Sequence, residues 1–204
     1  MAKLHSTQRT DHKLRKPDET PVVVPAARYD TTTLALHWII AGAVIAQWLG
    51  AHAIDWFPRG PLRVDARSAH ICLGVVLAGV LVFRLYWRMR RGWTFQGPER
   101  TILDLAATVM QLALDGLLAA ILLLGVFNTW LRGDSIMGWF SIPKFGDFAA
   151  AERHQFANQV VGLHRNAANL LLALAAMHAL AAIAHHVVLK DEVLRRMTPR
   201  WALR

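Results

Sequence analysis

The sequence is poor in cysteine and in charge. Its single cysteine, Cys72, cannot form an internal disulfide, and it excludes thiolate-bound iron–sulfur clusters and Cys-rich zinc sites. Because the chain has no Cys-x-x-Cys-His motif, covalent haem attachment is excluded too. Charged residues make up 18% of the 204 residues, below the roughly 25% that is usual for soluble domains. These shortages leave a membrane protein or an unusually apolar helical bundle.

Hydrophobic residues make up 54% of the chain and gather in four long runs. The runs cover about residues 34–54, 69–87, 102–127 and 160–189, each close to the ~20 residues that a helix needs to cross a bilayer. No run alternates apolar and polar residues at period two, which argues against a transmembrane β-barrel. We therefore predict an all-α membrane protein with a bundle of four transmembrane helices. The alternative fold is a soluble four-helix bundle.

Basic residues are distributed unevenly around these runs. If both termini lie on one side of a membrane, 16 of the 23 lysines and arginines flank that side and 7 flank the other. The positive-inside rule then places both termini in the cytoplasm. Nucleic-acid binding would need a folded basic face with stacking aromatic residues, whereas these charges flank apolar helices. We expect membrane lipid and no nucleic acid among the partners.

Three regions are expected along the chain. Residues 1–30 mix both signs of charge with three prolines, and we interpret them as a flexible cytoplasmic N-terminal tail. Residues 31–190 contain the four apolar runs and form the transmembrane domain. Residues 191–204 form a basic cytoplasmic C-terminal segment.

Histidines recur in the apolar runs, where a polar group must be paired or functional. In the last run, His164 and His178 are 14 residues apart, which on a helix is about 40° out of phase and about 21 Å along the axis. His37 lies near the cytoplasmic start of the first run, and His70 lies at the periplasmic start of the second. The depths match in the pairs His37–His178 and His70–His164. This arrangement predicts two non-covalent, bis-histidine b-type haems in the bundle.

Other interpretations of these histidines stay open. Each histidine could hydrogen-bond to a neighbouring helix without binding a metal. His52, at the outer end of the first run, competes with His70 for the periplasmic site. Zinc is disfavoured because no carboxylate or thiolate accompanies the histidines at ligand spacing.

Several short motifs, in order along the chain, are similar to those of a known family. They are His37-Trp38, Trp56-Phe57-Pro58-Arg59, His70 with Gly74, Arg84, His164, His178, Ala184-His185-His186, Lys190-Asp191, Leu194, Arg196-Met197 and Pro199-Arg200. With them, the segment 29–200 resembles the bacterial di-haem cytochrome b561 family, and within it the superoxide oxidase type. The resemblance implies the same two ligand pairs, with His37 and His178 at the cytoplasmic-side haem. It also implies a location in the bacterial inner membrane.

The function that the resemblance implies is oxidation of periplasmic superoxide to dioxygen, with ubiquinone reduced near the cytoplasmic-side haem. The same haems would serve an electron-transfer subunit that links a docked dehydrogenase, hydrogenase or soluble cytochrome to the quinone pool. A small transporter or scaffold without a cofactor is the third alternative, and the depth-matched histidines argue against it.

Three residues near the expected haems are further candidates. Arg165, next to His164, suits pairing with a haem propionate or attraction of superoxide, unless it only snorkels to the interface. His185 lies two turns beyond His178 on the same face and suits quinone binding and proton donation. Asp115, the one acid at depth, is either a proton relay or a paired packing residue. Further basic residues that could attract an anion at the periplasmic side are Arg59, Arg63, Arg67, Lys144 and Arg153.

Overall fold

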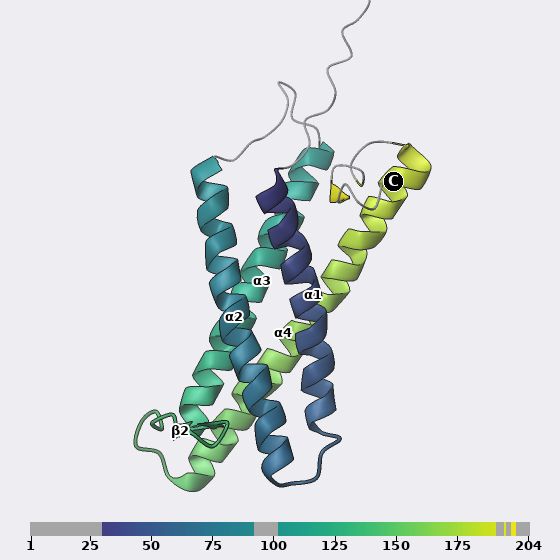
Figure 1. Cartoon of the computed structure of the whole chain (residues 1–204). Coiled ribbons are helices and arrows are strands. Elements are labelled where there is room, and N and C mark those ends of the chain that lie inside the picture. The colour runs from purple at the N-terminus through teal and green to yellow at the C-terminus, as the bar shows by residue number, and fades with distance from the viewer. Residues whose placement is uncertain (1–29, 92–101, 191–193, 195–196, 199–204) are drawn as a thin grey trace, which may run out of the picture.

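Four long helices dominate the computed structural model, which describes residues 30–91, 102–190, 194 and 197–198 (Figure 1). They are α1 (Thr31–Ile54), α2 (Pro61–Arg91), α3 (Ile102–Arg132) and α4 (Ala150–Ala184). A π-helix, η1 (His185–Leu189), continues α4, and the short strands β1 (Ser135–Ile136) and β2 (Phe140–Ser141) lie between α3 and α4. The predicted N-terminal tail, apart from its last residue, and most of segment 191–204 lie outside the described residues.

All four helices are long and apolar enough to cross a membrane, which confirms the four helices expected from the apolar runs. Few of their side chains are buried within the bundle, and large apolar side chains such as Leu123 and Val82 are exposed on its outside. A water-soluble bundle would bury its apolar face, whereas helices in a bilayer present apolar side chains to lipid. The exposed apolar surface therefore supports the membrane interpretation over the soluble one.

Two helices begin well before the apolar runs that predicted them. α2 starts at Pro61 rather than near residue 69, and α4 starts at Ala150 rather than near residue 160. Hydropathy marks only the part of a helix that lies in hydrocarbon, and helical hydrogen bonding continues through the polar turns beyond it. Pro61 suits the first position of α2, because the backbone N–H that proline lacks would have no helical partner there.

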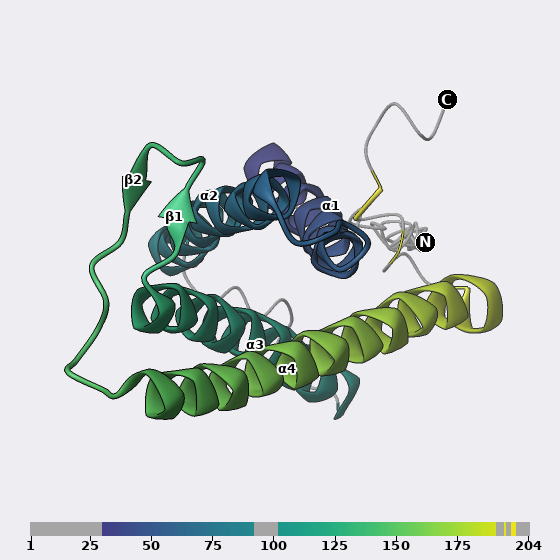
Figure 2. The ribbon, with the colours of Figure 1, turned by 90° about the horizontal axis from the view of Figure 1, so that it is seen from below.

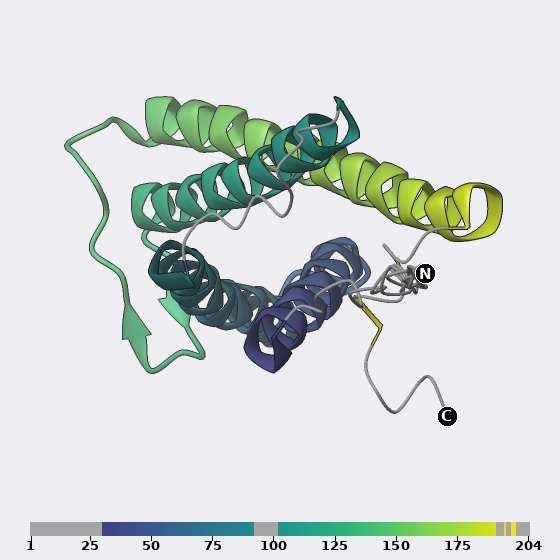
Figure 3. The same cartoon turned by 90° about the horizontal axis from the view of Figure 1, so that it is seen from above.

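The helices run alternately up and down, and neighbours in sequence pack side by side. α1 packs against α2, α2 against α3 and α3 against α4, while α1 and α4 have few direct contacts. The two views along the bundle show α1 beside α2 on one side and α3 beside α4 on the other (Figures 2 and 3). The main buried cluster joins three helices through Leu77, Leu81, Leu118, Ile121 and Leu171. α2 and α3 are thus the two central helices in this series of contacts.

Side chains of α2 and α4 tie the segment between α3 and α4 to the bundle. The fully buried hydroxyl of Ser68 on α2 accepts a hydrogen bond from the Met137 amide at 3.1 Å and lies 3.1 Å from the Ser135 carbonyl oxygen. Arg153 on α4 donates hydrogen bonds to the carbonyl oxygens of Leu131, Phe145 and Gly146. Arg153, expected as one of the charges that attract an anion, therefore also organises this segment.

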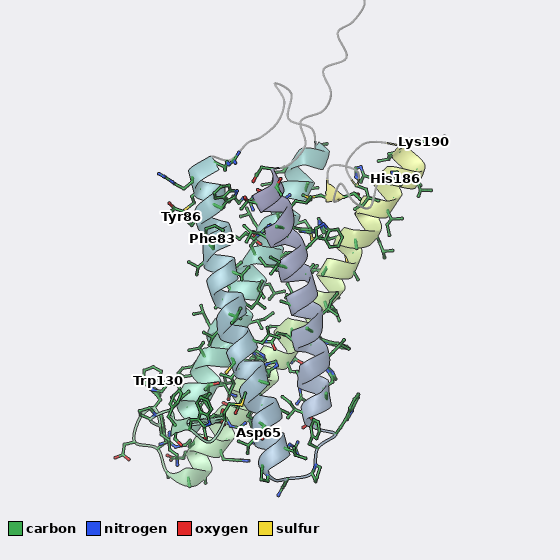
Figure 4. All side chains as sticks on the ribbon, viewed as in Figure 1. Asp65, Phe83, Tyr86, Trp130, His186 and Lys190 are labelled. Atoms are coloured by element: carbon green, nitrogen blue, oxygen red, sulfur yellow. The ribbon has the colours of Figure 1, made fainter. Side chains whose placement is uncertain are left out.

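The start of α1 and the end of α4 lie at the same end of the bundle (Figure 1). Figure 4 shows Tyr86 and His186 near that end and Asp65 and Trp130 near the opposite one. Asp30 caps α1 there, since its carboxylate accepts hydrogen bonds from the amide and the hydroxyl of Thr33. Asp30 also accepts a hydrogen bond from Trp87 of α2 at 3.3 Å. This end is called the first end below, and the end with the strands is called the second end.

Candidate functional site

At the first end of the bundle, His37 of α1 faces His178 of α4. Their ring centres are 6.4 Å apart and their planes make an angle of 65°. Both side chains are half-buried. The two helices that carry them have few direct contacts, so the imidazoles face each other from helices that are not a closely packed pair.

Near the second end, His70 of α2 faces His164 of the same α4. Their ring centres are 6.3 Å apart and their planes make an angle of 74°. α4 therefore supplies one histidine to each pair, as the 14-residue spacing predicted. The structure brings together both pairs that were matched by depth.

The spacing of the two pairs fits a single metal ion between each pair of imidazoles. A bond from a metal ion to an imidazole nitrogen is about 2 Å long and the ring centre lies about 1 Å farther, so two such ligands on opposite sides have centres about 6 Å apart. Direct hydrogen bonding or stacking of two imidazoles would bring the rings closer than 6.3 Å. A bis-histidine haem iron therefore fits both positions.

The hydrogen bond of His164 leaves the correct nitrogen for a metal. Its Nδ1 lies 3.0 Å from the carbonyl oxygen of Ile121 on α3, and because a carbonyl only accepts, Nδ1 carries the proton. Nε2 of His164 is then unprotonated and can bind iron. Gly125, one turn after Ile121, makes room for this ring, since a Cβ there would lie 3.2 Å from Cε1 of His164.

His70 is held by its backbone, and its ring has an unpartnered polar atom. The backbone carbonyl of His70 accepts a hydrogen bond from Nε2 of Gln47 on α1 at 3.0 Å. Its buried Nδ1 has no hydrogen-bond partner among the residues that the structure describes. A buried polar atom without a partner is costly in a helix bundle, and such atoms often mark a missing ligand or water. Gln47 was not identified from the sequence as part of this site.

His52, the competitor for the second-end site, is placed elsewhere. Its ring packs on Trp48 of its own helix at 4.2 Å between centres, and its Nδ1 lies 2.8 Å from the Trp48 carbonyl oxygen. The His52 side chain is exposed, whereas His70 is half-buried and faces His164. The geometry favours His70 over His52.

The comparison with known families agrees with this geometry. Residues 28–200 match the family of prokaryotic cytochrome b561. The chain belongs to this family. The match confirms the resemblance seen in the motifs, and it makes the protein a membrane electron-transfer cytochrome of a family that binds haem b.

Three relatives cover most of this cytochrome. Cytochrome b561 homolog 2 of Escherichia coli (strain K12) is 30% identical over 180 residues, 83% of this chain and 90% of that protein. Cytochrome b561 homolog 1 of the same strain is 28% identical over 177 residues, 85% of this chain and 98% of its own. The probable superoxide oxidase CybB of Yersinia pestis is 25% identical over 175 residues, 85% of this chain and 97% of its own.

The candidate proton relay of the cytochrome, Asp115 on α3, forms ion pairs with two arginines of α2. Nε of Arg84 lies 3.1 Å from Oδ1, and a terminal nitrogen of Arg88 lies 3.3 Å from Oδ2. The carboxylate side chain is 12% exposed. The structure thus places Asp115 in a paired arrangement. These partners were not identified from the sequence, although the four-residue spacing of the two arginines puts them on one helix face and could have indicated a shared partner.

The remaining two candidates lie beside the histidine pairs in the chain. Arg165 is exposed and has no hydrogen bond or ion pair with another described residue, so its guanidinium can meet an external anion. His185 is half-buried and begins η1, directly after α4 ends. π-Helical turns within helices occur frequently at functional sites.

Proposed function

We propose that this cytochrome binds two haem b groups, one between His37 and His178 and one between His70 and His164, and that it oxidises superoxide and reduces ubiquinone. The observation that carries the proposal is the pair of facing imidazoles at each of two depths, 6.4 and 6.3 Å between ring centres. A haem iron held by two imidazoles supplies one-electron transfer at each site. The probable superoxide oxidase among the relatives supports superoxide as the donor.

We place the first end of the bundle in the cytoplasm and the second end in the periplasm of a bacterial inner membrane. Arg90, Arg91 and Lys190 lie at the first end, and most lysines and arginines of the chain fall in segments on that side. The positive-inside rule supports this orientation, because basic residues beside transmembrane helices stay on the cytoplasmic side. It puts His70 and His164 on the side where superoxide would arrive.

At the periplasmic side, positive charge would attract the anionic donor. A cavity of about 380 Å³ at the start of α2 is lined by Arg59, Gly60, Arg63, Val64 and Arg67. Arg63 is paired with Asp55, and Arg67 lies 3.6 Å from Asp134, so these two charges are partly neutralised. Arg59 and Arg165 are exposed and supply the attraction in this proposal.

At the cytoplasmic side, quinone reduction needs protons as well as electrons. Two superoxide anions give one electron each and leave as dioxygen, while ubiquinone takes two electrons and two protons and leaves as ubiquinol. His185 lies two helical turns beyond His178, toward the first end, which suits a residue that donates a proton to a quinone oxygen. A relay role for Asp115 would require this carboxylate to exchange a proton while paired with Arg84 and Arg88.

Stopped-flow spectroscopy of the purified cytochrome tests the proposed donor and acceptor together. Mixing with superoxide should reduce the haems on the timescale of the stopped-flow measurement, and subsequent addition of ubiquinone should reoxidise them. Superoxide dismutase in the first mix should abolish the reduction. Haems that stay oxidised with superoxide but are reduced by a soluble cytochrome or a dehydrogenase would instead support a subunit that takes electrons from a redox partner protein.

A further inference from the structure

A charged cluster lies within the membrane-spanning part of the bundle. Asp115 of α3 is shared by Arg84 and Arg88 of α2, and the three side chains are 12%, 18% and 22% exposed. Charged groups in a bilayer are costly and usually serve a function. α2 and α3 already share the buried apolar cluster that contains Leu77 and Leu118, so the charged cluster is not needed to join them.

Arg84 is the member of the cluster that lies toward the first-end histidines. Trp87 of α2 donates a hydrogen bond to Asp30 before α1, so these two helix ends lie side by side, and Arg84 and His37 lie seven and six residues inside them. His70 of the second-end pair is 14 residues from Arg84 on the same helix, about 21 Å along the axis. The cluster therefore distinguishes the two sites electrostatically.

Asp115 holds Arg84 by its Nε. This contact, 3.1 Å from Nε to Oδ1, is made by the guanidinium nitrogen nearest the aliphatic part of the side chain, and it fixes the direction of the side chain. The position of the positive charge relative to the two imidazoles is therefore set by α3 rather than left to a mobile side chain.

We infer that Arg84 is a positioning residue that raises the reduction potential of the haem held by His37 and His178 above that of the haem held by His70 and His164. The inference rests on the proposed haem ligands. A nearby positive charge favours the ferrous form, because reduction of ferric iron removes one unit of positive charge. Electrons entering at the periplasmic side would then be drawn toward the side where quinone is reduced.

The test is a potentiometric titration of the purified cytochrome, followed by haem absorbance. The His178→Ala variant, which should lack the first-end haem, assigns the two components. Arg84→Gln should lower the equilibrium constant for reduction of the first-end haem by about tenfold, a change of about 59 mV, and leave the other haem unchanged. In Arg84→Lys, which keeps the positive charge, both reduction potentials should stay close to those of the unmodified protein.

Two further variants control for folding and for general charge effects. Asp115→Asn should raise the potential of the first-end haem, since it removes the neutralising charge. Arg90→Gln removes the same charge from the same helix, but Arg90 is exposed and packs over Tyr86 at 5.9 Å, so both potentials should stay unchanged.

The outcomes separate this inference from the proposed function. If Arg84→Gln keeps both haems and their potentials are unchanged, the inference about Arg84 is overturned while the proposed function stands. The same holds if Arg90→Gln shifts the potential of the first-end haem as much as Arg84→Gln does. If Arg84→Gln loses the first-end haem, an unchanged potential in Asp115→Asn overturns the tuning role. Absence of haem between His37 and His178 in the unmodified protein would instead refute the proposed function.

Discussion

Gly125 provides a sharp test of how the second-end site is built. A methyl group at this position would lie 3.2 Å from Cε1 and 3.6 Å from Nδ1 of His164. Carbon atoms in contact prefer about 3.5–4.0 Å, so in Gly125→Ala the imidazole must move by a few tenths of an ångström. Since the Nδ1 partner, the Ile121 carbonyl, belongs to the same helix as the new methyl, moving away from the methyl lengthens that 3.0 Å hydrogen bond.

The expected size of the effect follows from what this hydrogen bond does. Partners that orient a ligand imidazole typically contribute a factor of about 10–100 in metal affinity, or about 1.4–2.7 kcal/mol. Alanine also stabilises a helix over glycine by about 0.5–1 kcal/mol. Gly125→Ala should therefore have weaker haem binding at one site without loss of the fold, and Gly125→Val, which adds two more methyl groups, should lose that haem.

Gly116→Ala is the matched control, because Gly116 lies on the same helix and a Cβ there would meet nothing within 4 Å. The assay is haem release from the purified cytochrome to excess apomyoglobin, with haem content per chain measured by pyridine haemochrome. One of the two haems should leave about 10–100 times faster in Gly125→Ala, and neither should in Gly116→Ala. Equal release from the two variants would refute the argument that His164 is a haem ligand oriented through α3.

Three other changes have defined outcomes. His185→Ala should keep both haems and normal reduction by superoxide but slow electron transfer to ubiquinone by about 10²–10⁴-fold, and an unchanged rate would exclude proton donation. A topology reporter fused after Arg204 should be active only in the cytoplasm, and periplasmic activity would reverse the orientation. Burial raises the pKa of Asp30, but the hydrogen bonds from Thr33 and Trp87 and the charge of Arg91 together hold the pKa below its ordinary value. The contribution of Asp30 to thermal stability should therefore be fully present above pH about 4 and be lost as the pH drops through the lowered pKa, and Asp30→Asn should remove that contribution.

The four helices and the two histidine pairs could be predicted because both depend on position along one axis. Length and hydropathy identify a transmembrane helix, and a rise of about 1.5 Å per residue converts a residue number into a depth. In an up-and-down bundle, depth then matches His178 with His37 and His164 with His70. The facing rings in the structure follow from this one coordinate.

Lateral relations between helices could not be predicted in the same way. The sequence favoured His70 but left His52 as a competitor, because excluding it depends on which way each ring turns rather than on depth. The sequence left Asp115 as either a proton relay or a paired packing residue, because its arginine partners lie 31 and 27 residues earlier, on another helix. The helix ends were also missed, since the polar first turns of α2 and α4 carry no hydropathy signal.

α3 contains none of the four facing histidines, yet it orients groups at both sites. Near the second end, its Ile121 carbonyl sets the proton position of His164 and its Gly125 leaves room for the ring. Nearer the first end, its Asp115 forms an ion pair with Arg84, the residue inferred to act on the site of His37 and His178. Ligand residues of a metal site depend on such partners for orientation and basicity. Substitutions on α3 should therefore change affinity and potential while leaving the number of histidine ligands intact, which separates its contribution from that of α1, α2 and α4.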